Sequence, residues 1–387
     1  MKILFLVDGH VLRMGGAELQ AFSLAQRLQA QGHTVEIVAP HLDRNTEKNT
    51  EHRGMKVRQL GYWRIAKLSS VFFMLRFAWF LRKEGRNFDA IHIHMVHKMA
   101  AVTGLLRPYA PCPVIAKVSG AYEFFDGEQS SIMRFGSLQY WLYKAVSKLD
   151  HFQAISKDTC QRLEQAGIDA EKIHAIPNGV DTDKFIRSKA LHSDKEQHKT
   201  VISYCGRLVA VKGLHTLIAA AAKLQQQFPE RFEIQLNGDG PLGETLRQQV
   251  SNLGLESVVL FNGRNDSVTD ALQSAHVYVQ VSRYEGLSNA VLEAMSSGLP
   301  LVLSAVGGNK DVVQQGRNGY LVESGDVDAL ADALARLIND RPLCQKLGDY
   351  SRQWAESQFS LNAVSQDLLK LYGENPISPQ LETVRSS

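Results

Sequence analysis

The sequence predicts an α/β protein with two doubly wound domains, each a parallel sheet covered by helices on both faces. Short apolar runs rich in β-branched residues alternate with longer helical patterns from the first residue onward. This alternation is typical of parallel sheets whose strands are buried on both faces. A polar stretch at residues 186–199 interrupts the alternation, which restarts at Thr200. The 387 residues are therefore expected to form two domains of similar size.

The first half opens with an apolar run that ends at Asp8. This run is shorter than the roughly 7–15 apolar residues of a secretory signal, so it indicates a strand. Gly32 ends the first helix and leads into the second strand. Strands are expected at residues 3–7, 34–39, 56–59, 90–94, 114–118, 151–155 and 172–176, with helices at 17–31, 65–82, 132–148 and 157–166.

The second half repeats the pattern, and its first strand again leads into a loop that contains glycines. Strands are expected at residues 201–205, 232–237, 258–261, 277–281 and 301–304, with helices at 214–227, 242–253, 268–274 and 289–297. Open α/β sheets bind ligands beyond the carboxyl ends of their strands. We therefore expect a ligand-binding cleft where the two domains face each other.

The alternation also sets the expected domain boundaries. The first domain covers residues 1–185, residues 186–199 form a linker, and the second domain covers 200–359. The helical pattern at 360–372 belongs to neither alternation, and we expect it to cross back to the first domain. The polar residues 373–387 are expected to be a loose tail.

Composition excludes several classes of protein. Hydrophobic residues make up 44% and charged residues 21% of the chain, unlike a disordered chain, a coiled coil or a collagen-like fibre. A net charge of +3 gives no indication of a nucleic-acid partner. The four cysteines stand 45 or more residues apart, which indicates neither a zinc site nor disulfides and suits a reducing cytoplasm. The longest apolar stretch, 68–81, contains Arg76 and is shorter than the ~20 residues of a membrane span.

Two glutamates follow the expected strand at 277–281. Glu285 lies in a loop, Ser288 is expected to cap the next helix, and Glu293 lies on that helix. Helical spacing would separate the two carboxylates by roughly 12 Å, about the distance from a sugar ring across a diphosphate to a ribose. The helix N-terminus between them offers N–H groups to an anion. The plain alternative is two solvent-facing acids beside a helix.

The setting EGLSNAVLEAMSSGLPLVLSAVGG resembles the signature of the retaining glycosyltransferases of family 4, which have the GT-B fold of two Rossmann-like domains. The resemblance covers roughly residues 1–372. It implies that Glu285 contacts the transferred sugar and that Glu293 binds the ribose hydroxyls of the donor. Backbone N–H groups of Gly286, Leu287 and Ser288 would then meet sugar hydroxyls or phosphate.

The loop Gly206–Gly213 holds two cations, Arg207 and Lys212, just after a strand and before a helix. By itself it could be a surface loop with two ordinary cations. Family 4 members have a similar loop, and the resemblance implies that both side chains bind the donor diphosphate. Preorganised cations stabilise the charge that develops as the diphosphate leaves, and losing one such donor typically costs ~2.7–4 kcal/mol. Arg207, Lys212 and Glu285 are therefore the predicted catalytic residues.

Three further segments are candidates for donor binding. Gly238 begins a G-x-G-x-x-G pattern, but the pattern follows the second strand of its half, whereas a dinucleotide fingerprint follows the first. The resemblance instead places Gly238 near the donor. It also places Gly16 against the donor phosphates from the first domain, although a helix start explains this glycine equally well. The loop around Arg264 is expected to contact the base, largely through backbone groups.

The first half departs from the family at one position. Many members have a histidine after the strand at 114–118, and this chain has Ser119. Ser119 and His94 are therefore the candidates on the sugar or acceptor side. His92, His94 and His97 could suggest a metal site, but structural histidines explain them better, since His92 and His94 share one strand face. The resemblance implies no metal and no cofactor.

A basic, aromatic segment at residues 62–83 lies within the most positive part of the chain. Residues 51–100 contain ten Lys and Arg against three Asp and Glu. We expect its helix to cover the sheet, with the cations on the solvent side. The alternative is an interfacial helix with aromatic residues in lipid. A basic first domain would in either case suit an anionic membrane surface as a partner.

These observations favour a retaining glycosyltransferase at the cytoplasmic face of a membrane. It would move a hexose from a nucleotide donor, most simply a UDP-sugar, to a saccharide or lipid-linked saccharide in surface polysaccharide or lipopolysaccharide synthesis. One alternative is a sugar-nucleotide epimerase of the same fold. Another is a two-lobed ligand-binding protein without catalysis.

Overall fold

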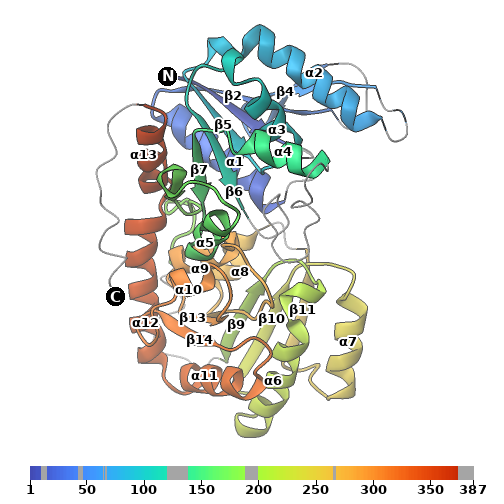
Figure 1. Cartoon of the computed structure of the whole chain (residues 1–387). Coiled ribbons are helices and arrows are strands. Elements are labelled where there is room, and N and C mark those ends of the chain that lie inside the picture. Colours follow the sequence, from blue (N-terminus) through green and yellow to red (C-terminus); the bar gives the residue numbers. More distant parts are fainter. Residues whose placement is uncertain are drawn as a thin grey trace. The chain divides into compact units, whose positions relative to one another are not determined.

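The chain forms two α/β units in the computed structural model (Figure 1). The structure describes residues 1–9, 15–41, 47–63, 65, 68–119, 138–187, 199–264 and 267–373. One unit comprises Met1–Asn178 together with the chain from Leu361 onward, and the other comprises Gly179–Ser360. Most of the expected linker, the start of the helix expected at 132–148 and the expected tail from 374 onward lie outside the described residues. The two parallel-sheet units confirm the predicted fold class.

The first unit contains an eight-stranded sheet in the order β3-β4-β2-β1-β5-β6-β7-β8. Neighbouring strands are parallel except β3 and β4, which pair antiparallel. The strands are β1 (Lys2–Val7), β2 (Thr34–Pro40), β3 (Lys48–His52), β4 (Met55–Leu60), β5 (Ala90–His94), β6 (Val114–Val118), β7 (His151–Ala154) and β8 (Ile173–Ala175). Sequence patterns predict all of them except β3, a polar strand at the edge of the sheet.

Helices cover both faces of this sheet. They are α1 (Gly16–Ala30), α2 (Ser69–Glu84), α3 (Lys98–Leu105), α4 (Leu138–Val146), α5 (Lys157–Gln165) and α13 (Leu361–Leu371), with 3₁₀ turns η1 (Gly85–Asn87), η2 (Arg107–Tyr109) and η4 (Ala170–Lys172). Successive side chains of a strand point to opposite faces. Accordingly, Leu4 and Leu6 share a core with residues of α2 to α5, while Ile3 and Phe5 share another with α1 and α13.

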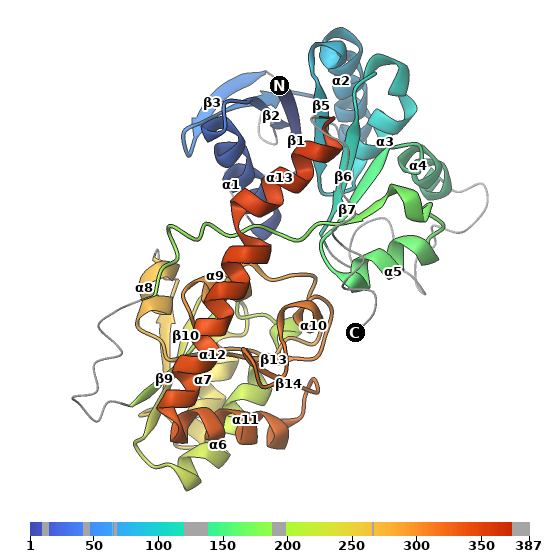
Figure 2. The same ribbon diagram turned by 90° about the vertical axis from the view of Figure 1, so that its left-hand side faces the viewer.

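The last helix, α13, packs against α1 in the first unit (Figure 2). Leu368 and the following Tyr372 are buried in the core that α1 and β1 form. The Tyr372 hydroxyl lies 2.6 Å from Nδ1 of His92 on β5. This places the expected crossing helix with the first unit, so residues 179–360 are inserted within it.

The second unit has a six-stranded parallel sheet in the order β11-β10-β9-β12-β13-β14. Its strands are β9 (Thr200–Cys205), β10 (Phe232–Asn237), β11 (Val259–Gly263), β12 (Val277–Gln280), β13 (Leu301–Ser304) and β14 (Gly319–Val322). Chain order reverses at β9, which has β10 on one side and β12 on the other. At this switch point, where the strand order reverses, the loops that follow the two central strands diverge to opposite sides of the sheet. Open α/β sheets bind their ligands in the crevice between such loops.

The second unit contains the four helices expected from the sequence and further helices after β13 that the sequence patterns do not predict. They are η6 (Ala210–Lys212), α6 (Leu214–Gln227), α7 (Gly243–Asn252), α8 (Val268–Gln273), α9 (Asn289–Ser296), α10 (Asn309–Val312), α11 (Val327–Asn339) and α12 (Arg341–Trp354), with a π-turn η7 (Ala355–Phe359). Buried residues of α6, α7 and α11 form one core with the sheet. No helix in the described part of the chain has both the length and the apolar character needed to cross a membrane.

Truncating Leu368 on α13 tests whether the C-terminal helix is part of the first unit's core. Leu368→Ala should lower the free energy of unfolding by about 2–5 kcal/mol, because it leaves a cavity at a fully buried site. Chemical unfolding followed by circular dichroism measures the change. Leu253→Ala, at a side chain that is 46% exposed, is the control and should leave stability nearly unchanged. Equal stability of both variants would contradict this packing.

Candidate functional site

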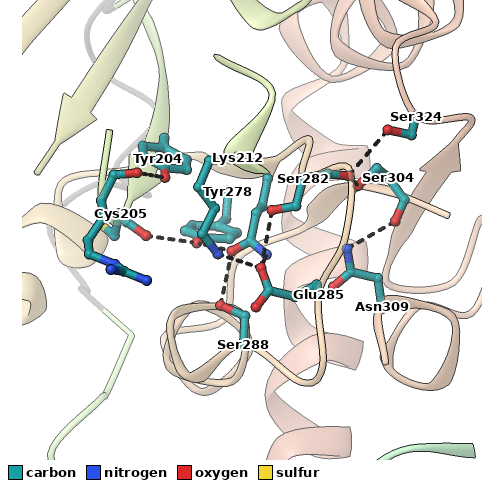
Figure 3. Close-up of polar contacts among 12 residues, drawn as sticks. Tyr204, Cys205, Lys212, Tyr278, Ser282, Glu285, Ser288, Ser304, Asn309 and Ser324 are labelled. Carbon is teal, nitrogen blue, oxygen red and sulfur yellow. Dashed lines mark hydrogen bonds and ion pairs between the residues drawn. The ribbon is translucent and has the colours of Figure 1, made fainter. Parts of the chain in front are cut away.

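The candidate site lies in the second unit, in the loops that follow β9 and β12. Lys212 ends the turn η6 after β9, and Glu285 lies in the loop after β12. Lys212 Nζ is 2.5 Å from Oε2 of Glu285, and their side chains are only 16% and 15% exposed. Figure 3 shows the Lys212 ammonium and the Ser282 hydroxyl directed at the Glu285 carboxylate. The structure thus brings two of the predicted catalytic residues into direct contact.

Further hydrogen bonds hold the same carboxylate oxygen of Glu285. Gln280 Nε2 donates to Oε2 at 2.9 Å and Ser282 Oγ donates at 3.1 Å. No described residue donates to the other oxygen, Oε1. A carboxylate can accept several hydrogen bonds, so Glu285 keeps capacity to accept bonds from a ligand hydroxyl.

Gln280 is itself fixed by buried hydroxyl groups. Its side chain is 1% exposed, and its Oε1 accepts bonds from Ser288 Oγ at 3.0 Å and from the Tyr278 hydroxyl at 3.2 Å. The sequence prediction that Ser288 caps the following helix is therefore only half right. Ser288 occupies the N-cap position of α9, but its hydroxyl makes no capping bond. The buried amide oxygen of Gln280 needs donors, and Ser288 supplies one.

Gln280 is a site residue that the sequence motifs do not indicate. The one feature of the sequence that could have indicated this role is the single amide side chain within β12, a strand whose residues are all buried. A polar side chain at such a position must find partners inside the protein. Here those partners include the predicted catalytic Glu285.

Two glycines allow the surrounding loops to come together. Gly213 has φ of +64°, and a Cβ there would overlap the carbonyl oxygen of Val281, at the end of the β12 segment. Gly307 has φ of +46°, and its Cβ would overlap the carbonyl oxygen of Glu285. Any larger residue would force these loops apart, because both the backbone conformation and the space require glycine.

Arg207 follows β9 and is exposed to solvent. Its carbonyl oxygen accepts a bond from the buried Tyr204 at 2.9 Å, and the next N–H, of Leu208, donates to the carbonyl of Asp239 at 2.9 Å. The backbone is therefore fixed, while the guanidinium makes no ion pair with any described carboxylate. Arg207 and Lys212 thus give the loop one unpaired cation and one that is paired with Glu285.

Glu293 lies in a different electrostatic environment on α9. Its carboxylate accepts no hydrogen bond from another described residue, and burial raises its pKa to about 7, while the charge of Lys184 acts in the opposite direction. As expected, Glu285 lies in the loop before α9, which begins at Asn289, so helical spacing does not describe the distance between the two glutamates. Glu293 is thus a carboxylate whose charged form lacks partners within the protein.

The remaining donor-side candidates lie at the same edge of the second sheet, after β10, β11 and β12. The N–H of Gly238 donates to the carbonyl of Gly263 at 2.7 Å, next to the exposed Arg264. The carbonyl of Gly286 accepts a bond of 2.6 Å from the N–H of Gly308, and the neighbouring Leu287 is buried. These bonds connect neighbouring strand-end loops into one surface.

Three predicted residues belong to the first unit. Gly16 is the first residue of α1, and Ser119 directly follows β6. His94 ends β5 with 1% exposure, and its ring stacks on His92 with centroids 4.3 Å apart. Burial lowers the pKa of His94 well below its ordinary value, and His92 and Lys117 lower it further. The imidazole is therefore neutral at physiological pH.

The described part of the chain contains no group of three or more His, Cys, Asp and Glu side chains that could hold a metal ion. The chain also contains an Asp-x-Asp triplet at residues 181–183, a pattern that occurs in metal-using transferases. Here Asp181 Oδ1 accepts bonds from the N–H groups of Asp183 and Lys184, both at 3.1 Å, so its carboxylate closes a turn.

Known protein families match both halves of the chain. The family model "Glycosyl transferases group 1" matches residues 187–354, and "Glycosyltransferase Family 4" matches residues 14–184. The chain belongs to the family 4 glycosyltransferases. The family resemblance of the Glu285–Glu293 segment is thereby confirmed.

Individual members of the family cover most of the chain. The N-acetyl-alpha-D-glucosaminyl L-malate synthase of Bacillus anthracis is 24% identical over 91% of this chain and 92% of its own. The UDP-Gal:alpha-D-GlcNAc-diphosphoundecaprenol alpha-1,3-galactosyltransferase of Escherichia coli is 28% identical over 68% of this chain and 69% of its own. The crystal structure of Anabaena HepE in complex with UDP superposes with a TM-score of 0.78 and 22% identity, over 96% and 99% of the two chains. The fold of this glycosyltransferase is therefore GT-B.

Replacing Gln280 tests whether it positions Glu285 in the glycosyltransferase. Gln280→Leu should lower kcat about 10- to 100-fold, since a hydrogen bond to a charged group contributes about 1.5–3 kcal/mol. The dissociation constant of the donor, measured by calorimetry, should change much less. Gln235→Leu, on strand β10 of the same sheet, is the matched control, because its amide donates to Glu233 and not to Glu285. A folded Gln280→Leu variant with normal kcat would contradict the positioning role.

Glu293 predicts a pH-dependent stability difference. The folded-state pKa of about 7 lies above the ordinary 4.5, so wild type loses stability as pH rises from 4.5 through 7. Glu293→Gln removes this loss and should be more stable by up to about 3 kcal/mol at pH 8, with no advantage at pH 4. Urea unfolding across this range measures the difference. Glu244→Gln, at a 91% exposed side chain, should show no such trend, and a flat difference for Glu293→Gln would refute the shift.

Proposed function

We propose that the chain is a retaining hexosyltransferase that uses a nucleotide-diphosphate sugar, most simply a UDP-sugar. The observation that carries the proposal is the Lys212–Glu285 pair at the switch point of the second sheet, beside the unpaired Arg207. A diphosphate needs cations, and a sugar needs a hydrogen-bond acceptor held in place next to them. Both are present within two adjacent strand-end loops.

Each charged residue then has a distinct role in transfer. Arg207 and Lys212 bind the diphosphate and neutralise the charge that grows as it leaves, which lowers the barrier to breaking the bond between the sugar and the phosphate oxygen. Oε1 of Glu285 accepts a hydrogen bond from a hydroxyl of the transferred sugar. The ribose hydroxyls donate to the Glu293 carboxylate and supply the hydrogen bonds that it lacks. With two cations at the diphosphate, we propose that the reaction needs no metal or other cofactor.

The rest of the predicted donor site completes this arrangement. Backbone groups of Gly238, Gly286, Leu287 and Ser288 would line the sugar and phosphates, and the loop of Arg264 would contact the base. Gly16 would reach the phosphates from the first unit. The complex of HepE with UDP and the UDP-galactose donor of the Escherichia coli relative support uracil as the base.

The acceptor is proposed to be a saccharide or a lipid-linked saccharide of a surface polysaccharide or lipopolysaccharide. Support comes from the same relative, whose named acceptor is a sugar on diphosphoundecaprenol. Ser119 and His94 are the candidates on the acceptor side. The four cysteines are all free thiols, in keeping with the proposed cytoplasmic location, and the basic first unit supports an anionic membrane surface as a partner.

Substitution of the three charged residues tests the proposed function. Arg207→Ala, Lys212→Ala and Glu285→Ala should each lower transfer at least about 100-fold, since one such electrostatic contact contributes ~2.7–4 kcal/mol. The assay is release of nucleoside diphosphate from UDP- and GDP-sugars with saccharide acceptors, and NMR of the product should show the donor's anomeric configuration. Lys223→Ala, a cation on α6 away from these loops, is the control.

Two results would overturn this proposal. One is near-normal transfer by folded variants of Arg207, Lys212 and Glu285. The other is conversion of the free nucleotide sugar to an epimer without any acceptor, which would identify an epimerase. Thermal shifts identify the base independently, because a ligand present at 100 times its Kd adds about 2.7 kcal/mol of stability.

A further inference from the structure

Helix α2 is apolar on two opposite sides. Its inner side places Phe73, Phe77 and Phe80 in the core of the first unit, where each is at most 3% exposed. The helix thus covers the sheet, as expected from the sequence, and it packs beside α3 on the outside of that sheet (Figure 1). A second row of large apolar side chains lies on its solvent side.

This second row, the outer stripe, consists of Leu68, Val71, Leu75 and Trp79. Their exposed fractions are 48%, 44%, 62% and 51%. Spacings of three and four residues align them along one face of the helix. The solvent side of the helix thus carries large apolar side chains as well as the expected cations. A helix that is apolar all round is normally buried on both sides, and a contiguous exposed apolar row marks an interaction surface.

Cations border the C-terminal end of the outer stripe. The Arg76 guanidinium lies 4.7 Å from the centre of the Trp79 ring, and Lys83 Nζ lies 5.0 Å from it. Arg82 stacks on Tyr109 at 4.8 Å. Arg82 and Lys83 are exposed, and neither forms an ion pair with a described carboxylate. The stripe thus ends in a tryptophan flanked by Lys83 and by Arg76, whose guanidinium also pairs with Glu47.

We propose that the outer stripe docks on the surface of an anionic lipid bilayer. Apolar side chains with tryptophan at the boundary and Arg or Lys beside it are the composition that binds at the level of lipid headgroups. The excess of ten Lys and Arg over three Asp and Glu in residues 51–100 complements a negative surface. A protein partner or a second copy would not require this one-sided charge. The proposal rests on the proposed function for its setting, because a lipid-linked acceptor lies at such a surface.

Sedimentation of the full chain with vesicles tests the proposal without any substrate. The chain should bind phosphatidylcholine vesicles that contain phosphatidylglycerol, bind pure phosphatidylcholine weakly, and lose binding at high salt. Leu75→Ser with Trp79→Ser should weaken binding at least about tenfold, because the serines remove apolar area that would enter the lipid. Arg82→Gln with Lys83→Gln should weaken binding to the anionic vesicles about 30-fold, since each cation near the surface contributes about fivefold.

Matched variants of the second unit distinguish specific docking of the outer stripe from non-specific binding of the protein to vesicles. Leu253→Ser removes an apolar side chain that is 46% exposed, and Lys223→Gln removes a cation, so both should bind vesicles like wild type. Transfer to a water-soluble acceptor should stay normal in all stripe variants. If the wild-type chain does not bind anionic vesicles but still transfers sugar to the water-soluble acceptor, docking is refuted and the proposed function stands.

Other outcomes would also overturn the docking proposal. The first is the absence of binding to anionic vesicles. The second is binding that the stripe substitutions leave unchanged. The third is a dimer, seen by sedimentation velocity, that Leu75→Ser dissociates, because the stripe would then be covered by a second copy.

Discussion

The carboxylate of Glu285 is a partly buried negative charge, and such a charge is stable only where donors surround it. Three donors meet its Oε2 from two segments: the ammonium of Lys212 after β9, and the amide of Gln280 and the hydroxyl of Ser282 at the end of β12. They can converge because β9 and β12 are neighbours in the sheet although far apart in the chain. Gly213 and Gly307 let the loops approach closely enough. The reversal of strand order at β9 therefore determines both where the site lies and how its carboxylate is oriented.

The two glutamates of the family motif have the same side chain but different surroundings, and these give them different properties. Glu285 receives its hydrogen bonds from the protein, and Gln280 behind it is held in turn by Tyr278 and Ser288. The carboxylate of Glu293 receives none from the part of the chain that the structure describes, and burial raises its pKa to about 7. Glu285 is thus oriented before a ligand arrives, whereas Glu293 is a destabilised group that hydroxyls of a ligand can satisfy. A site that lowers stability in this way gains binding strength from the same residue.

The sequence predicts most of the fold because continuous apolar runs mark strands buried on both faces, and the family motif points to Glu285. It does not predict the role of Gln280, since periodicity shows that a side chain is buried but not what it meets. Ser288 has the local preference of a helix cap, yet a tertiary partner takes its hydroxyl. The edge strand β3 is polar and leaves no apolar run. The sequence does not predict that the outer stripe is exposed, because an apolar helix pattern does not show how much of the helix surface a neighbouring sheet covers.

The insertion of residues 179–360 into the first unit makes its core depend on both ends of the described chain. Where the chain returns to the first unit, the Tyr372 hydroxyl hydrogen-bonds with Nδ1 of His92. Burial and the charge of Lys117 lower the pKa of His92 to about 3. This histidine stays neutral throughout the physiological range, and burial keeps the Tyr372 hydroxyl protonated. The connection between α13 and β5 is therefore insensitive to pH. A loss of donor binding as pH falls through 7 should accordingly originate at Glu293, because protonation removes the charge that makes its carboxylate a strong acceptor for ribose hydroxyls.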